Sequence, residues 1–390
     1  ITSQTLAFGL VGEVPEMKVD LGNVVSELSD DTMQRHGWSF FRGGQEFALV
    51  GDGYRELRKL VDRLLRKRAF AAGFSEYFLQ QTIVQWCRVE DDEGSLSDHL
   101  LATCTSAWDK HLLLVPFANL EIETDFAIGN VRVVTIDPAI FTRARTFTRE
   151  RNPDKPNAGE GIQKLADQFA NHAAAEIAVA GEPRYARDRA MTVAHDVAAV
   201  VPFPSPARVS IRLHSPIQPI GFSTLRSENI LSVENDRLKR FDRAYLHIAL
   251  SHWKLGIAEI DSLKSGRNAN IAVLFDGRED TPFVARARRA FFAYCRARGE
   301  YDVAERLVAT IGALEAFLLQ GEVEGLQSKV AERLAFLTAT NVDDRLKVVA
   351  DYRSAYRLRS RAVHQLQGVD DEEAAERLNL HALVFFQKIV

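Results

Sequence analysis

The chain has 390 residues and a formal net charge of -4 at pH 7, and 46% of its residues are hydrophobic and 26% charged. A chain of this length is expected to form two or three globular units, and its ordinary composition excludes a disordered or fibrous protein. The weak negative charge excludes a general polyanion binder, so any contact with nucleic acid must come from a local basic surface.

The three cysteines, Cys87, Cys104 and Cys295, form no CxxC or CxxH pair. This spacing argues against a structural zinc site and a disulfide framework, and we expect neither a metal nor a cofactor. No run of about 18 uncharged apolar residues occurs, so we expect no membrane span. Glu13 and Glu16 interrupt the apolar core that a signal peptide needs. These patterns favour a cytoplasmic location.

The first 280 residues mix strand and helix patterns, and we expect an N-terminal α/β domain at 1–150 and a continuation or second subdomain at 151–280. A hairpin is predicted at 39–50, closed by a Gly51-Asp52-Gly53 turn and followed by a helix over 54–70. Residues 77–89 fit a helix or a strand. Strands with β-branched residues are predicted at 112–117, 120–122, 126–128 and 131–136.

Residues 152–161 are polar and rich in Pro and Gly, which is typical of a loop. An Ala-rich helix is predicted at 162–180, and a short strand at 208–213. A long helix is predicted from Ser227 to about Gly256, because apolar residues such as Leu238, Phe241 and Tyr245 are spaced for one face.

Residues 281–390 show no strand pattern and predict five helices. Thr281-Pro282 is typical of a cap followed by Pro at the first helical position. The five segments are 281–298, 301–320, 325–340, 343–366 and 370–390. Short polar breaks between them favour antiparallel neighbours in a bundle. The predicted fold class is therefore α+β, with a mixed α/β region followed by an all-α bundle.

The fourth of these helices gathers positive charge around one histidine. Six basic side chains precede His364, with Asp351 as the acid among them; they are Arg345, Lys347, Arg353, Arg357, Arg359 and Arg361. A charge run alone is most often a solvated helix face. A histidine among arginines favours instead a surface that contacts RNA, for which Arg353, Arg357 and Arg361 are candidates.

Arg359-Ser-Arg-Ala-Val-His364 fits the R-x4-H pattern of the HEPN superfamily, and the surrounding YRLRSRAVHQ resembles its Apea-like branch. The segments IGALEAFLL (311–319) and KVAERLAFL (329–337) are similar to the second and third helices of that branch. The resemblance covers roughly residues 281–390.

The resemblance implies a metal-independent endoribonuclease that acts as a homodimer, with two motifs meeting across a cleft, in antiphage defence or as a toxin. His364 would be the general acid or base, since the pKa of a histidine lies near neutrality. Arg359 would hold the phosphate. Ser360 occupies the polar position after the arginine, and Glu315 would orient the arginine or histidine from a neighbouring helix, unless it is a helix-surface residue.

Helix geometry leaves the choice of arginine open. At 100° per residue, Arg359 and His364 lie 140° apart around an ideal helix, whereas Arg357 lies within about 20° of His364. Either the helix ends or bends near Ser360, or a wide dimer cleft collects both directions, or Arg357 is the motif arginine.

A second interpretation is a non-catalytic HEPN module for dimerisation or RNA binding, with His364 as an ordinary helix-terminal residue and the specific function in the N-terminal region.

Other patterns carry less weight. His247 and His252 lack metal-site spacing, His195-Asp196 lacks a nucleophile, and the basic helix at 55–68 is more typical of a solvated face.

Overall fold

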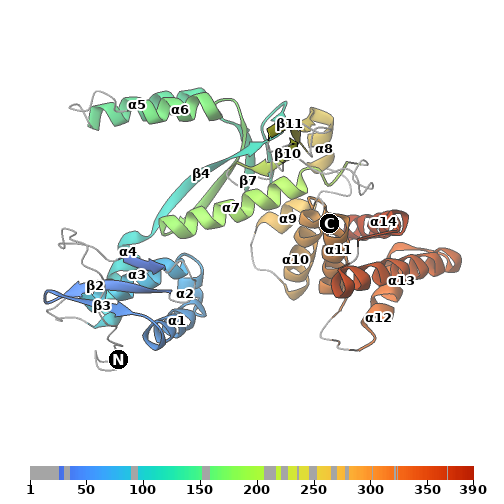
Figure 1. Cartoon of the computed structure of the whole chain (residues 1–390), viewed down its shortest axis with the longest axis horizontal. Helices are drawn as coiled ribbons and strands as arrows, with labels where there is room; N and C mark the ends of the chain where they lie inside the picture. The colour runs from blue at the N-terminus through green and yellow to red at the C-terminus, as the bar shows by residue number, and fades with distance from the viewer. Residues whose placement is uncertain are drawn as a thin grey trace. The chain divides into compact units, whose positions relative to one another are not determined.

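The computed structural model describes residues 26–29, 36–88, 95–151, 159–205, 217–220, 227–234, 237–245, 253–264, 270–276, 281–300, 302–319, 322, 324–366 and 368–390. Contacts divide the chain into two compact units, one of residues 1–112 and 178–190 and the other of residues 113–177 and 191–390. Figure 1 shows the helices and strands of both units, coloured along the chain.

In the first unit, the described residues up to Ala107 form a three-stranded antiparallel sheet and four helices. The strands, in the order β1-β2-β3, are β1 (Ser26–Ser29), β2 (His36–Arg42) and β3 (Gln45–Leu49). The helices are α1 (Asp52–Leu65), α2 (Arg68–Ala71), α3 (Glu76–Arg88) and α4 (Leu96–Ala107). In the core, the indole N–H of Trp38 donates to the side-chain oxygen of Gln80 at 3.0 Å, so a buried polar pair ties β2 to α3.

The predicted hairpin at 39–50 is confirmed, but the turn predicted at Gly51-Asp52-Gly53 is wrong. Gly51, with φ 56°, is the N-cap of α1, and the helix begins at Asp52, whose carboxylate suits the positive end of a helix. The segment predicted at 77–89, which fitted either element, is helical as far as the structure describes it, to Arg88, with Leu79, Ile83 and Cys87 buried at a spacing of four.

A five-stranded sheet has the order β6-β7-β8-β4-β9. Its strands are β4 (Asp109–Ala118), β6 (Phe126–Ile128), β7 (Val131–Thr135), β8 (Ala173–Gly181) and β9 (Gln218–Pro219). β5 (Leu120–Ile122) pairs in parallel with β12 (Trp253–Leu255). The four strands predicted between 112 and 136 are thus confirmed.

The helix predicted at 162–180 is wrong in its second half. The chain forms α6 (Glu160–Phe169) and then β8. Ala173, Ala174 and Ala175 are all buried, and β8 lies between β7 and β4. Burial in the interior of a sheet therefore outweighs the intrinsic preference of alanine for a helix.

The long helix predicted over 227–256 is also wrong. β10 (Ser227–Glu234) and β11 (Arg237–Tyr245) pair as an antiparallel hairpin, in which Glu234 lies opposite Arg237. β-branched residues in β10, such as Ile230 and Val233, favour a strand over a helix. The strand predicted at 208–213 and the pair His247 and His252 lie outside the described residues.

The remaining helices before the bundle are α5 (Pro138–Arg151), α7 (Pro183–Val200), α8 (Ile257–Lys264) and α9 (Ile271–Asp276). From residue 257 to 389, the described part of the chain contains helices and no strand. The five predicted helices are confirmed as α10 (Pro282–Ala297), α11 (Val303–Leu318), α12 (Leu326–Thr338), α13 (Val342–Gln365) and α14 (Glu372–Ile389). The fold class is α+β.

Aromatic side chains fill the core of the bundle. Tyr294 of α10 stacks on Phe386 of α14 with ring centroids 4.6 Å apart. The hydroxyl of Thr281 accepts from the backbone N–H of Val284 at 3.2 Å, and Pro282 follows the cap, which confirms the predicted start of α10. Among the described helices, none combines the length and the apolarity needed to cross a bilayer.

Candidate functional site

Helix α13 carries the predicted arginines, the serine and the histidine. The side chain of Asn341 accepts from the backbone N–H of Asp344 at 2.8 Å and caps the start of the helix. One side of α13 packs into the bundle through four buried residues, Val348, Tyr352, Ala355 and Leu358. Their spacing of three and four residues fixes the rotation of the helix, and hence the direction in which each basic side chain points.

A group of four side chains, here called the α11–α13 polar cluster, consists of Glu315 from α11 and Tyr352, Tyr356 and Arg359 from α13. The guanidinium carbon of Arg359 lies 5.4 Å from the centroid of the Tyr356 ring. Burial raises the pKa of Glu315, and the charge of Arg359 opposes that effect. Burial, followed by the charges of Glu315 and Tyr356, raises the pKa of Tyr352. The structure therefore brings Glu315 and Arg359 together.

Two buried polar atoms of this cluster, the hydroxyl oxygen of Tyr352 and Nε of Arg359, have no hydrogen-bond partner in the described part of the chain. An unpaired buried polar atom costs about 1–3 kcal/mol. The contact of Arg359 that the structure shows is therefore the one with the Tyr356 ring, and its charge reaches the Glu315 carboxyl without a hydrogen bond from Nε.

His364 lies in the last turn of α13 and is exposed. The helix runs on to Gln365, after which Leu366 takes a left-handed conformation with φ 53°. The alternative in which the helix ends near Ser360 is therefore wrong. Arg359 is half-buried, whereas His364 lies about 140° around the helix from it and is exposed.

Four residues of α13 form a second group, here called the outer stripe: Arg353, Arg357, Ser360 and His364. At 100° per residue their side chains leave the helix within about 60° of one another. Arg353, Arg357 and His364 are exposed, and Ser360 is half-buried. The outer stripe thus presents two cations and an imidazole to solvent on one side of a helix, an arrangement that can contact a phosphodiester.

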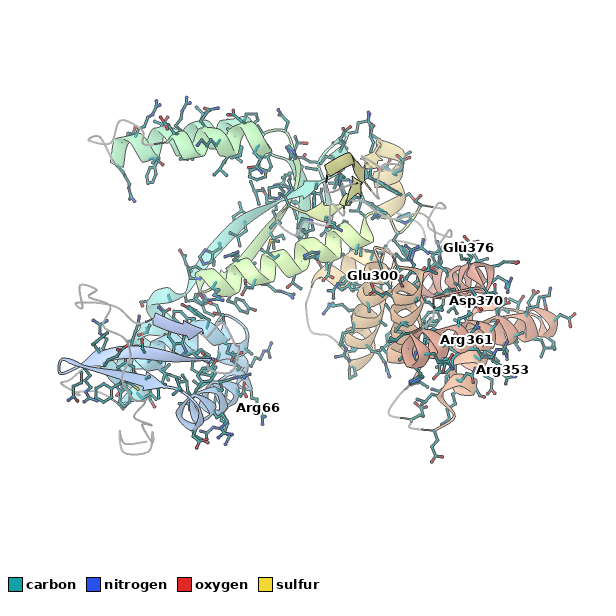
Figure 2. All side chains as sticks on the ribbon, in the orientation of Figure 1. Arg66, Glu300, Arg353, Arg361, Asp370 and Glu376 are labelled. Carbon is teal, nitrogen blue, oxygen red and sulfur yellow. The ribbon has the colours of Figure 1, made fainter. Side chains whose placement is uncertain are left out.

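Arg361 is engaged elsewhere. Its two terminal nitrogens donate to the two carboxylate oxygens of Asp370 at 2.9 and 2.7 Å, joining the last turns of α13 to the residues before α14. Figure 2 labels this pair together with Arg353. A carboxylate held in this bidentate manner neutralises the arginine, so Arg361 contributes less positive charge than the sequence suggests.

Sequence reasoning missed a charged network between α13 and α14. The carboxylate of Asp351 accepts from Nε of Arg377 and lies 2.9 Å from Nε2 of His381. Arg377 and His381 are four residues apart on α14, a spacing that places both on one side of the helix and could have indicated a shared partner. Asp351, the acid among the basic residues of α13, therefore holds α13 and α14 together.

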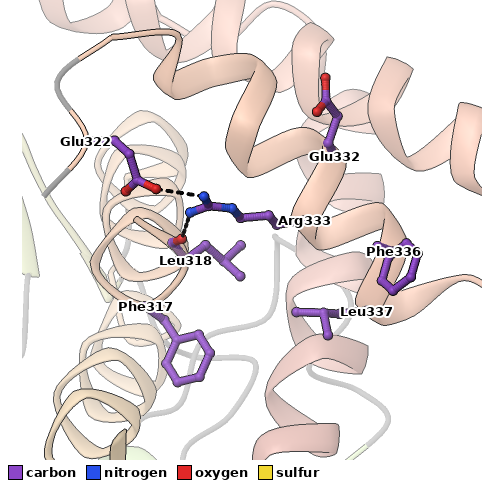
Figure 3. Close-up of a pocket in the computed structure, with 7 residues that line it drawn as sticks. All are labelled: Phe317, Leu318, Glu322, Glu332, Arg333, Phe336 and Leu337. Atoms are coloured by element: carbon purple, nitrogen blue, oxygen red, sulfur yellow. Dashed lines mark hydrogen bonds and ion pairs between the residues drawn. The ribbon is translucent and has the colours of Figure 1, made fainter. Parts of the chain in front are cut away.

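A groove of about 630 Å³ lies elsewhere on the bundle (Figure 3). Apolar and acidic side chains line much of it, including Phe317, Phe336 and Glu332. Arg333 donates to the backbone oxygen of Leu318 and to the Glu322 carboxylate, the latter at 2.6 Å. With its one lining cation paired, this groove offers no evident site for a phosphate.

The weaker sequence candidates acquire structural partners. Asp196 on α7 accepts from Nε of Arg296 at 3.0 Å, and burial, followed by the charge of Arg296, lowers the pKa of His195. On α1, Arg55 pairs with Asp52 and Lys59 pairs with Glu56. These pairs favour structural roles over chemistry.

Comparison of the chain with protein-family models, curated proteins and solved structures finds no match.

Proposed function

We propose that the helical region at 281–390 is a cytoplasmic, metal-independent endoribonuclease of the HEPN type. The observation that supports it best is the outer stripe, in which an exposed histidine and two exposed arginines share one side of α13. The R-x4-H pattern and the resemblance of residues 311–337 to HEPN helices supply the enzyme class.

Cleavage of RNA by its own 2′-hydroxyl requires a base for that hydroxyl and an acid for the departing 5′-oxygen. The 2′-oxygen bonds to phosphorus, the bond from phosphorus to the 5′-oxygen breaks, and a 2′,3′-cyclic phosphate and a 5′-hydroxyl result. His364 is the group that moves one of these protons. In a homodimer through the helical region, two copies of His364 would serve as acid and base.

The arginine that meets the phosphate is Arg357 in this geometry, since it lies about 20° from His364 and is exposed. Its guanidinium would donate two hydrogen bonds to the phosphate oxygens on which charge develops. Arg359, next to Glu315, would hold α13 against α11 and would act on the site through helix position.

The test is cleavage of a labelled RNA in EDTA by the full chain and by His364→Ala, with Arg289→Ala on the exposed face of α10 as control. We expect the histidine variant to lose about 10²–10⁴-fold in rate and the control to retain the parent rate. Cleavage by His364→Ala at the parent rate, or no cleavage by the parent chain across an RNA panel, would sink the proposal.

A non-catalytic RNA-binding or dimerisation module is the second candidate. The pairing of Arg361 with Asp370 favours it over the first candidate, because the pair removes one cation that could stabilise the charge of a reacting phosphate near His364. RNA binding by the parent chain that leaves the RNA intact, together with a dimer mass in solution, would establish it. A toxin or antiphage role belongs to the first candidate and predicts growth arrest that depends on His364 when the chain is expressed in bacteria.

A further inference from the structure

A pair of helices outside the bundle, α5 and α6, lies side by side (Figure 1) and contains no buried residue in either helix. The contact between them includes a hydrogen bond of 2.6 Å from the Arg145 guanidinium to the side-chain oxygen of Gln163. Six residues of α5 are half-buried, and four of them follow one side of the helix from Arg145: Phe141, Ala144, Arg145 and Thr148; the other two, Ala139 and Ile140, lie in its first turn. The other side of α5 therefore faces solvent.

That exposed side carries an arginine, a phenylalanine and a second arginine four residues apart, here called the α5 stripe: Arg143, Phe147 and Arg151. A spacing of four residues turns a helix by 40°, so the three side chains form one row. Phe147 is 54% exposed, and the guanidinium carbon of Arg151 lies 4.5 Å from its ring centroid. An aromatic ring so exposed between two cations stabilises little of the fold.

The charge of α5 is unusual for this chain. Its 14 residues include four arginines and one glutamate, a net charge of +3, whereas the whole chain carries -4. Within the described residues, neither Arg143 nor Arg151 forms a salt bridge with a carboxylate. The basic helix α1 differs in this respect, because Arg55 and Lys59 there each have an acidic partner.

We propose that the α5 stripe binds single-stranded nucleic acid. Arg143 and Arg151 would contact successive phosphates, and an unpaired base would stack on Phe147 or on the Arg151 guanidinium, the combination by which proteins hold single strands. A lipid surface is disfavoured because, among the described residues of α5, Phe147 is the one large apolar side chain that is exposed. Ile140, which shares its side of the helix, and Phe141 are both half-buried. The inference is independent of cleavage at His364.

Binding is measured by fluorescence anisotropy of the full chain with a labelled 2′-O-methyl oligouridylate of roughly 12 nucleotides, a length within single-strand site sizes. The 2′-O-methyl group blocks attack by the 2′-oxygen, so the readout does not depend on any nuclease activity. We expect Phe147→Ala to weaken binding roughly 5-fold or more. Arg143→Gln/Arg151→Gln should reduce the salt dependence of log K by about 1.4, the value for two phosphate contacts.

The matched control is Lys164→Gln/Arg289→Gln, which removes two positive charges at exposed helical positions outside the α5 stripe. Loss of affinity in the stripe variants and not in the control supports the inference. Equal losses in both double variants, or unchanged affinity in Phe147→Ala, would overturn it. So would absence of binding by the parent chain at low salt, or Phe147-dependent sedimentation with vesicles of anionic lipid without oligouridylate binding.

Discussion

Arg359 on α13 lies close enough to Glu315 on α11 for its positive charge to oppose the rise that burial causes in the pKa of that carboxyl. The burial effect is the larger of the two. The folded protein therefore disfavours the ionised form of the half-buried Glu315 carboxyl, even with the guanidinium nearby. The pKa of Glu315 on α11 therefore depends in part on the Arg359 charge that α13 carries.

Glu315→Gln should change stability in a pH-dependent way. Below the ordinary pKa of 4.5, the carboxyl is protonated in both the folded and unfolded chain. As pH rises above that value, the unfolded chain ionises first, so the parent chain loses stability relative to the glutamine variant until the folded pKa is passed. The gain of the variant should stay below about 1 kcal/mol, because solvent screens a half-exposed group.

Urea unfolding followed by circular dichroism on both sides of pH 4.5 measures this difference. Glu332→Gln, at an exposed position on α12, is the control for loss of a carboxylate charge. A difference that stays constant with pH, or one that favours the parent chain as pH rises, would contradict the expected sign.

Tyr352→Phe should leave the stability of the bundle unchanged or raise it by up to about 1 kcal/mol. The reason is that its buried hydroxyl has no hydrogen-bond partner in the part of the chain that the structure describes. Tyr294 is a matched control, since it is equally buried and its hydroxyl donates to the side-chain oxygen of Asn379 at 3.5 Å. Tyr294→Phe should cost about 0.5–1.5 kcal/mol. A similar cost for both variants would show that a bound water or partner satisfies Tyr352.

The C-terminal bundle could be predicted from the sequence because local signals agree with the tertiary structure there. Apolar spacing, the Thr281 cap and short polar breaks all indicate the helices that form. β8 and the β10–β11 hairpin could not be predicted, since alanine spacing and apolar spacing alone favoured helices. β8 is a strand because of its neighbours β7 and β4, which are far away in sequence and which local patterns do not report. β10 pairs with the adjacent β11, and there the apolar spacing of a helix concealed a hairpin.

The candidate site, too, could be predicted from the sequence only in part. The directions of Arg357 and His364 follow from helix geometry, and the exposure of both agrees with it. The partners of Arg361 and Asp351 could not be read from α13, since they are Asp370 beyond its end and Arg377 and His381 on α14. Ion pairs between helices depend on packing, which the sequence of one helix does not report. The sequence therefore counts Arg361 among the candidates for contact with RNA.

Asp370→Asn should release Arg361 and strengthen RNA binding by up to about 5-fold, the range expected for one partly exposed ion pair. The substitution should cost about 0.5 kcal/mol of stability, because the side chains are 41% and 64% exposed. Anisotropy with a 2′-O-methyl oligouridylate gives the affinity. In the Arg361→Gln background the gain should vanish, and a gain that persists there would show that Asp370 acts by general repulsion of the RNA.

Substitution of Arg357 and Arg359 should separate the contact with phosphate from the position of α13. Arg357→Ala removes an exposed side chain, so stability should stay within about 0.5 kcal/mol of the parent, while cleavage in EDTA falls about 10²-fold or more. Arg359→Ala removes the guanidinium that lies over the Tyr356 ring and the cation whose charge reaches Glu315, and it should cost about 0.5–2 kcal/mol of stability. Its loss of cleavage should be partly recovered at lower temperature, where more of the chain is folded. The opposite result would be abolished cleavage with parent-like stability in Arg359→Ala, together with retained cleavage in Arg357→Ala. That result would assign the phosphate contact to Arg359, and it would require a bend in α13 or a cleft between two chains.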